Sequence, residues 1–228
     1  MQRRLIRIIS VTMFIIILSF IILVFSACSS KVHQSEQQES TPITIEIPII
    51  QPDPGCKDIG FPQTYDAIID SAYKKHFPNA LLDRPCLLRA QLAKESSLNP
   101  EADSSHALGI GQQIPAVADE CRSGGLIGTR VDPRFSANCA AYKDNRNWEF
   151  WTSNRTVECK VGLMLASYVS GAGWALRGQK KAAESGIYAR CIEDIRPFLV
   201  QVGMSQENVD TQQEYISTIL RFEQEMTS

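Results

Sequence analysis

The chain has 228 residues, a formal net charge of −2 at pH 7 and seven cysteines. Its first 27 residues hold three arginines and no acidic residue, so the remainder carries a charge of −5. This acidic balance, without any motif of a nucleic-acid-binding module, excludes the basic nucleic-acid binders, and we expect no nucleic-acid partner. About 170 residues after Cys56 suffice for one hydrophobic core. We therefore expect a single globular domain over residues 56–228.

Residues 1–27 have the pattern of an export signal. Three arginines precede an apolar run over residues 8–27, an order typical of secretory signals. The segment Phe25-Ser26-Ala27-Cys28 resembles a bacterial lipobox, in which Cys28 becomes the lipidated N-terminus. An uncleaved anchor is the alternative, because about 20 apolar residues can span a bilayer. Both predict attachment to a membrane in the bacterial cell envelope, in the periplasm or on the outer surface.

Residues 28–55 are predicted to be a flexible tether. Their first half is polar and typical of disorder. Residues 43–47 then alternate like a short strand, and flanking prolines prevent its extension. A flexible chain of this length spans roughly 30 Å on average. Fully extended, it would reach about 90 Å at most. The alternative is that the strand-like residues 43–47 pack on the domain, which would shorten the tether.

The cysteines indicate an oxidising compartment. If Cys28 carries lipid, an even set remains: Cys56, Cys86, Cys121, Cys139, Cys159 and Cys191. Six cysteines allow fifteen pairings, and we expect Cys121 to pair with Cys139 around a glycine-rich stretch. There is no Cys-x-x-Cys pair and the three histidines are scattered, so we predict no metal site and no cofactor.

The rest of the chain is predicted to be helical. An apolar stripe over residues 65–73 has helical spacing, and Asp83 and Pro85 are expected to start the next helix, which Asn99-Pro100 ends. Ile114-Pro115-Ala116 begins a short helix with proline in its first turn. Further helices are expected over residues 139–142, 157–168, 174–185 and 188–202. Gly186 is expected to end the third of these, and Pro197 to kink or end the fourth. A last helix is expected after Ser205, with four residues facing inward: Val209, Ile216, Ile219 and Leu220.

Glu95 is the strongest candidate for a catalytic residue. Leu88, Leu92 and Glu95 are spaced i, i+4, i+7 and share one helix face. Because that face is otherwise apolar, we expect the carboxyl group to point toward the core or a cleft wall, where desolvation raises its pKa. A carboxylic acid that is protonated near neutral pH can protonate a glycosidic oxygen. The structural alternative is a solvated glutamate near a helix end.

Three motifs follow one another in a recognisable order. They are Glu95-Ser96, Gly109-Ile110-Gly111-Gln112 and Tyr168-Val169-Ser170-Gly171. Over roughly residues 61–197 the chain resembles the lysozyme-like domain of soluble lytic transglycosylases, which cleave the glycan strands of peptidoglycan. The resemblance implies an all-α, mostly helical domain. The lysozyme-like superfamily to which such a domain would belong is classed as α+β. The family usually has methionine at the position of Gly111 and asparagine at that of Val169.

The resemblance also implies substrate-binding roles for Ser96, Gly109, Gln112, Tyr168 and Gly171. The amide of Gln112 would hydrogen-bond sugar N-acetyl or hydroxyl groups, and the Tyr168 hydroxyl would lie near the Glu95 carboxyl. The structural alternatives are a core aromatic for Tyr168 and a solvent-facing serine for Ser96. The three tryptophans are candidates for stacking on sugar rings or for the core: Trp148, Trp151 and Trp174.

The implied reaction is non-hydrolytic cleavage between N-acetylmuramic acid and N-acetylglucosamine. Glu95 would protonate the leaving oxygen and then act as base on the muramic acid 6-hydroxyl, which closes a 1,6-anhydro ring. A second carboxylate would have to come from the next loop, from Glu101 or Asp103. Two alternatives remain open: a muramidase that hydrolyses the same bond, and, because of Gly111 and Val169, a catalytically silent peptidoglycan-binding lipoprotein.

Overall fold

The computed structural model describes residues 55–228 of the chain. The leader, the lipidation candidate Cys28 and the strand-like residues 43–47 lie outside these residues. Within residues 55–228 the protein is mostly helical, as predicted, and the β pairing consists of two isolated bridges, Asp103 with Leu108 and Leu108 with Gln113. In this part of the chain no helix is long and apolar enough to cross a bilayer.

The helices of residues 55–228 follow one another with short connections, except before α4. Their bounds are α2 (Asp66–His76), η1 (Asn79–Leu81), α3 (Leu87–Ser96), α4 (Pro115–Ser123), α5 (Pro133–Phe150), α6 (Val157–Ser170), α7 (Ala172–Glu184), α8 (Ile192–Leu199), η2 (Val200–Val202) and α9 (Gln206–Thr227).

Several helices lie where the sequence predicted them, for the expected local reasons. Pro115 stands in the first turn of α4, where its missing N–H costs no helical hydrogen bond. Gly186 follows α7 with a φ of 77°, as a glycine C-cap does. The Ser205 hydroxyl caps α9 by accepting a hydrogen bond from the Asn208 N–H. The predicted inward stripe of α9 is confirmed for Val209, Ile216 and Ile219, which are buried.

Other boundaries were predicted wrongly. Helix α3 begins at Leu87 rather than at Asp83 or Pro85, and it ends at Ser96 because Ser97 adopts a left-handed conformation with φ 55°. The helix therefore stops before Pro100 can act on it. Helix α8 begins only at Ile192, and Pro197 lies inside it. The helix ends soon after that proline and continues as the 3₁₀ turn η2.

Helix α5 is much longer than the predicted segment 139–142. It spans 18 residues, and its buried positions include Ser136, Asp144 and Asn147 beside apolar ones. Polar residues on the buried face hide the apolar period that would mark a helix. The helix begins with Pro133 after Asp132, whose side chain accepts a hydrogen bond from the Arg134 N–H.

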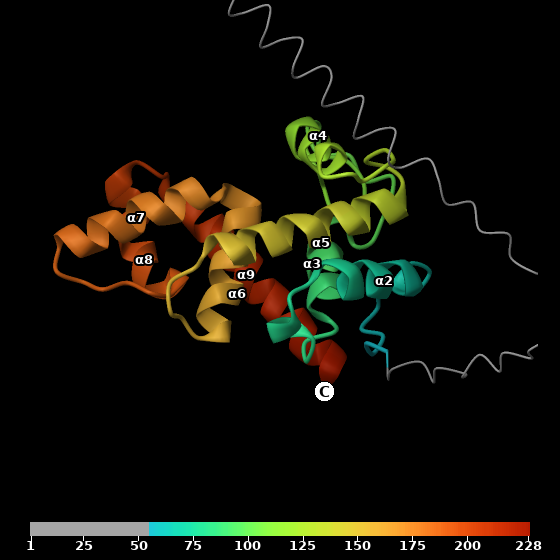
Figure 1. Ribbon diagram of the computed structural model, residues 1–228, viewed down its shortest axis with the longest axis horizontal. Coiled ribbons are helices and arrows are strands. Elements are labelled where there is room, and N and C mark those ends of the chain that lie inside the picture. Colours follow the sequence, from blue (N-terminus) through green and yellow to red (C-terminus); the bar gives the residue numbers. More distant parts are fainter. Residues whose placement is uncertain (1–54) are drawn as a thin grey trace, which may run out of the picture. The chain divides into compact units, whose positions relative to one another are not determined.

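Helix α5 crosses the middle of the described structure (Figure 1). Helices α2 and α4 pack against it on one side of the picture, and α6 packs against it toward the other. Helices α7 and α8 pack against each other and against α6. Helix α9 returns to contact both α3 and α6. The last helix of the chain thus lies beside the helix that carries Glu95.

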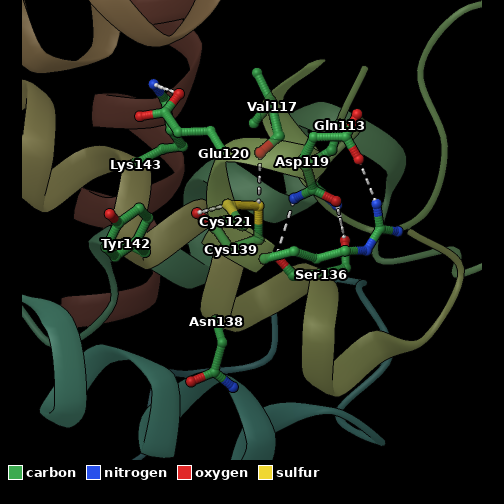
Figure 2. Close-up of a disulfide and its surroundings, with 12 residues drawn as sticks. Gln113, Val117, Asp119, Glu120, Cys121, Ser136, Asn138, Cys139, Tyr142 and Lys143 are labelled. Carbon is green, nitrogen blue, oxygen red and sulfur yellow. Dashed lines mark hydrogen bonds and ion pairs between the residues drawn. A yellow bond between two sulfur atoms is a disulfide. The ribbon is translucent and has the colours of Figure 1, made fainter. Parts of the chain in front are cut away.

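Three disulfides join the six cysteines of residues 55–228. The predicted pair Cys121–Cys139 is confirmed, and the others are Cys56–Cys86 and Cys159–Cys191. Figure 2 shows Cys121 of α4 bonded to Cys139 of α5, with Lys143 and Glu120 pairing nearby at 2.8 Å. This disulfide belongs to a small second core of four buried residues: Ala118, Cys121, Phe135 and Cys139. The disulfide ties α4 covalently to α5 beside this small core.

We predict that replacing both Cys121 and Cys139 by alanine loosens α4 selectively. The free energy of unfolding should fall by about 2–4 kcal/mol, and the amides of residues 115–123 should exchange with solvent faster. Urea unfolding and amide hydrogen exchange measure the two effects. The control is the same double replacement at Cys159 and Cys191, which should leave the exchange of α4 unchanged. Equal protection of α4 in both variants would contradict this role of the disulfide.

Candidate active site

Glu95 lies in the last turn of α3, and its side chain is partly exposed. The Tyr215 hydroxyl, on α9, donates a hydrogen bond to Glu95 Oε1 at 2.5 Å. Beside this contact, Lys94 Nζ of α3 pairs with Glu214 Oε1 of α9 at 2.9 Å. The carboxyl group is therefore held from a helix that lies 120 residues further along the chain.

The electrostatics of Glu95 are those expected from its apolar helix face. Burial raises the pKa of Glu95 to about 7, although the Tyr215 hydrogen bond and the Lys94 charge act in the opposite direction. Burial, with the Glu95 charge, also raises the pKa of Tyr215 well above its usual range. The tyrosine therefore stays protonated and acts as a donor. The prediction that desolvation raises the pKa of Glu95 is confirmed.

The glycine-rich turn at residues 109–112 is attached to the end of α3. The Ser96 hydroxyl donates to the Ile110 carbonyl at 2.9 Å. The Gly111 carbonyl accepts a hydrogen bond from the Tyr168 hydroxyl at 2.8 Å, and the Gly111 N–H donates to Ser136 Oγ at 3.0 Å. The three sequence motifs are thus joined directly, because Ser96 and Tyr168 both bind the turn.

Two glycines of this turn are required by close contacts. Gly109 has a φ of 78°, and a Cβ atom there would lie 1.8 Å from the Arg130 carbonyl oxygen. A Cβ at Gly111 would lie 2.2 Å from Nε2 of Gln113. Gln113 is buried, and it exchanges two hydrogen bonds with Ser136 of α5, at 2.7 and 2.9 Å. Gln113 therefore fills the space that a side chain at position 111 would need.

Gln112 is used differently from the expectation. Its φ is 45°, and its Nε2 donates to the carbonyl oxygens of Ala102 and Gly109 at 3.1 and 3.0 Å. The amide N–H groups therefore close their own loop, which stabilises the turn beside Glu95. Direct recognition of a sugar through these two N–H bonds would require the loop to open.

The third motif, residues 168–171, contributes the Tyr168 side chain and a bend at Gly171. Burial is the main cause that raises the pKa of Tyr168, and the Glu95 charge raises it further, so the two groups interact electrostatically. Glu95 receives its direct hydrogen bond from Tyr215 instead. Gly171 has a φ of 79° and is exposed between α6 and α7. Val169, where the family has asparagine, is exposed to solvent.

Two of the three tryptophans belong to the core. Trp148 and Trp151 are 7% and 3% exposed, so neither offers a ring face to a sugar. The Trp151 indole N–H donates to Ser167 Oγ at 3.0 Å. Trp174 is partly exposed, and the Arg177 guanidinium lies 3.9 Å from its ring centre. Of the three, Trp174 alone remains a candidate for stacking.

Sequence reasoning missed several residues around Glu95. Tyr215 has no motif of its own, although it lies on the inward side of α9 with the predicted Ile216 and Ile219. Asp144 of α5 is fully buried. Burial is the main cause that raises the pKa of Asp144, and the Glu95 charge raises it further. No pattern in the sequence marks it. The carboxylates that the sequence suggested, Glu101 and Asp103, are both exposed.

The residues around Glu95 offer acid–base chemistry at one carboxyl group. Within residues 55–228, no group of three or more His, Cys, Asp and Glu side chains is placed to hold a metal ion. No protein-family model matches the sequence, and no curated protein matches it closely enough to count as a relative. The arrangement can deliver and accept one proton near pH 7, at a carboxyl group that solvent can reach.

We predict that Gly109→Ala destabilises the protein far more than Gly186→Ala. Both glycines have a φ near 78°, but nothing lies within 4 Å of a Cβ at Gly186. Gly186→Ala should cost about 1–2 kcal/mol for the left-handed conformation, and Gly109→Ala more than about 4 kcal/mol because backbone must move. Urea unfolding of both variants gives the comparison. Equal losses would show that the turn tolerates a Cβ.

We further predict that Tyr215→Phe raises the pKa of Glu95 by about one unit, because the hydrogen bond that favours the ionised carboxylate is lost. A nuclear magnetic resonance titration of ¹³C-labelled glutamate measures this shift. The matched control is Tyr168→Phe, whose hydroxyl donates to Gly111 rather than to Glu95. Its effect on the Glu95 pKa should be clearly smaller. A larger shift in Tyr168→Phe would reverse the assignment of the two tyrosines.

Proposed function

We propose that residues 56–228 form a lysozyme-like lytic transglycosylase that acts on peptidoglycan glycan strands. The observation that carries the proposal is the Glu95 carboxyl, with a pKa raised by burial to about 7. It lies at the end of α3, next to the turn that Ser96 and Tyr168 hold. A membrane attachment through residues 1–28 would place this activity in the cell envelope.

The proposed reaction uses Glu95 twice. In the first step the protonated carboxyl gives its proton to the glycosidic oxygen, and the bond between that oxygen and C1 of N-acetylmuramic acid breaks. In the second step the resulting carboxylate accepts the proton of the muramic acid 6-hydroxyl, whose oxygen bonds to C1. The product is a 1,6-anhydro ring and the carboxyl is protonated again. A pKa near the working pH suits a group that must act as acid and as base.

The surroundings of Glu95 favour this lyase reaction over hydrolysis. Glycosidases with two carboxylates place the second one about 5–10 Å away and facing the substrate. Asp144 is enclosed in the core and cannot hold a water molecule against a sugar. Asp103 accepts a hydrogen bond from the Ser105 N–H in an exposed turn. Within residues 55–228, Glu95 is thus the carboxyl whose burial and position suit the chemistry.

The other motif residues support the reaction chiefly by shaping the site. Ser96, Gly109 and Gln112 hold the turn through hydrogen bonds and close contacts with the backbone. We expect the glycan strand to lie against this turn and against Tyr168. Gly171 supplies the bend that lets α7 follow α6 directly.

Glu95→Gln is expected to reduce turnover by a factor of at least about 10²–10⁴, because an amide cannot deliver or accept the proton. The fold should survive, since an amide is easier to bury than a carboxylate. A carboxyl with a raised pKa holds its proton better in the folded state, so its contribution to stability is lost as pH rises toward 7. At pH 8, Glu95→Gln should therefore be more stable than the wild type.

The assay is release of soluble muropeptides from purified peptidoglycan, followed by mass analysis. The wild-type product should carry a 1,6-anhydro end and be lighter by one water than a hydrolytic product. Glu101→Gln, the same substitution at an exposed carboxylate of the next loop, should retain activity. Near-normal activity of Glu95→Gln would refute the catalytic role. A product with a reducing end would indicate a muramidase, and binding without release by the wild type a silent binder.

A further inference from the structure

Asp144 and Gln91 form an enclosed pair beneath Glu95. Gln91 lies on α3, one turn before Glu95, and Asp144 lies on α5; both side chains are completely buried. Gln91 Nε2 donates a hydrogen bond to Asp144 Oδ1 at 3.3 Å. Within residues 55–228, no protein group supplies a hydrogen-bond partner for the other two oxygens of the pair, Gln91 Oε1 and Asp144 Oδ2.

One proton satisfies both of these oxygens. If Asp144 Oδ2 carries a proton, it can donate to Gln91 Oε1, and the acid and the amide then form a closed pair with two hydrogen bonds. An ionised Asp144 would leave both oxygens, Asp144 Oδ2 and Gln91 Oε1, as buried acceptors without a protein donor, which is costly. The geometry of the pair therefore favours the protonated acid.

The groups that face Asp144 from the other helices carry no positive charge. They are Glu95 on α3, Tyr168 on α6 and Tyr215 on α9. The Lys143 charge, next to Asp144 on α5, acts to lower the pKa of Asp144, but Lys143 Nζ pairs with Glu120 at 2.8 Å. Burial, with the nearby Glu95 charge, raises the pKa of Asp144 well above its usual range.

We propose that Asp144 is a neutral carboxylic acid that pairs with Gln91 and serves as a positioning residue for Glu95. The part that concerns Glu95 rests on the proposed function. The pair ties the last turns of α3 to α5, which fixes where the Glu95 carboxyl stands. Neutrality matters as well, because an ionised Asp144 would raise the pKa of Glu95 further. A carboxyl group with a higher pKa is a weaker acid, so the proton transfer of the first step would slow.

The test of protonation compares the full-length protein with Asp144→Asn, which keeps the shape and the neutrality of the side chain. In the unfolded wild type Asp144 ionises above about pH 4, whereas in the folded protein it keeps its proton. The unfolding constant of the wild type should therefore rise, relative to that of Asp144→Asn, about tenfold per pH unit between pH 5 and 7. A ratio independent of pH would overturn the proposal.

The matched control is Asp119→Asn, at an exposed aspartate, whose unfolding constant should follow that of the wild type with pH. If Asp144→Asn does not fold, the infrared spectrum of wild-type protein labelled with ¹³C-aspartate decides. A protonated carboxyl band at pH 7 supports the proposal, and its absence overturns it. Neither measurement depends on catalysis, so a failure of the proposed function would leave the protonation result interpretable.

A second arm tests the pair and its effect on Glu95. Asp144→Leu and Gln91→Leu each leave the other member of the pair buried without its hydrogen-bond partner. The unfolding constant of the double variant should therefore be about tenfold smaller than the value expected by multiplying the effects of the two single variants. Asp144→Asn should keep the pH dependence of kcat/KM, whereas Asp144→Leu should lower kcat. Independent effects of the two leucine variants would show that no pair exists. A pH profile displaced to lower pH in Asp144→Asn would show that Asp144 is ionised.

Discussion

A buried polar group without a hydrogen-bond partner is costly, and around Glu95 helix α5 supplies several of the partners. Ser136 binds the glycine-rich turn and Gln113, Asp144 receives the bond from Gln91, and Asn147 donates to the Met164 carbonyl of α6. Leaving one such group without its partner costs about 1–3 kcal/mol. Because these bonds are directional, they set the position of α3, the turn and α6 more narrowly than apolar contacts alone would.

The same arrangement explains how a carboxyl group can sit in a largely apolar setting. Burial favours the protonated form of Glu95, while the hydroxyl of Tyr215 favours the ionised form. The balance leaves the pKa near 7, where both forms are populated. Helix α9 is therefore as important to the proposed chemistry as α3, and the Lys94–Glu214 pair holds the two helices together at this point. The proposed two-step reaction requires this balance.

The departures from the transglycosylase pattern have local structural consequences. The absence of a side chain at Gly111 leaves room for Gln113, which is bound twice to Ser136. Gln112 bonds within its own loop, so the turn is held by internal hydrogen bonds rather than by packing of a methionine. Val169 is exposed and offers no amide in place of the family's asparagine. In the proposed function, substrate recognition at these positions would therefore rely on backbone and tyrosine groups.

The sequence by itself determined what depends on neighbours within a few turns. The helical spacing of Leu88, Leu92 and Glu95 was enough to predict a desolvated carboxyl with a raised pKa. The starts of α4 and α9 followed from Pro115 and Ser205. It could not reveal α5 in full, because buried polar residues break the apolar period of that helix. Nor could it indicate that Tyr215 would meet Glu95 or Asp144 meet Gln91. Those contacts join residues 120 and 53 positions apart, and only the packing of α3 against α9 and α5 decides which distant polar groups become partners.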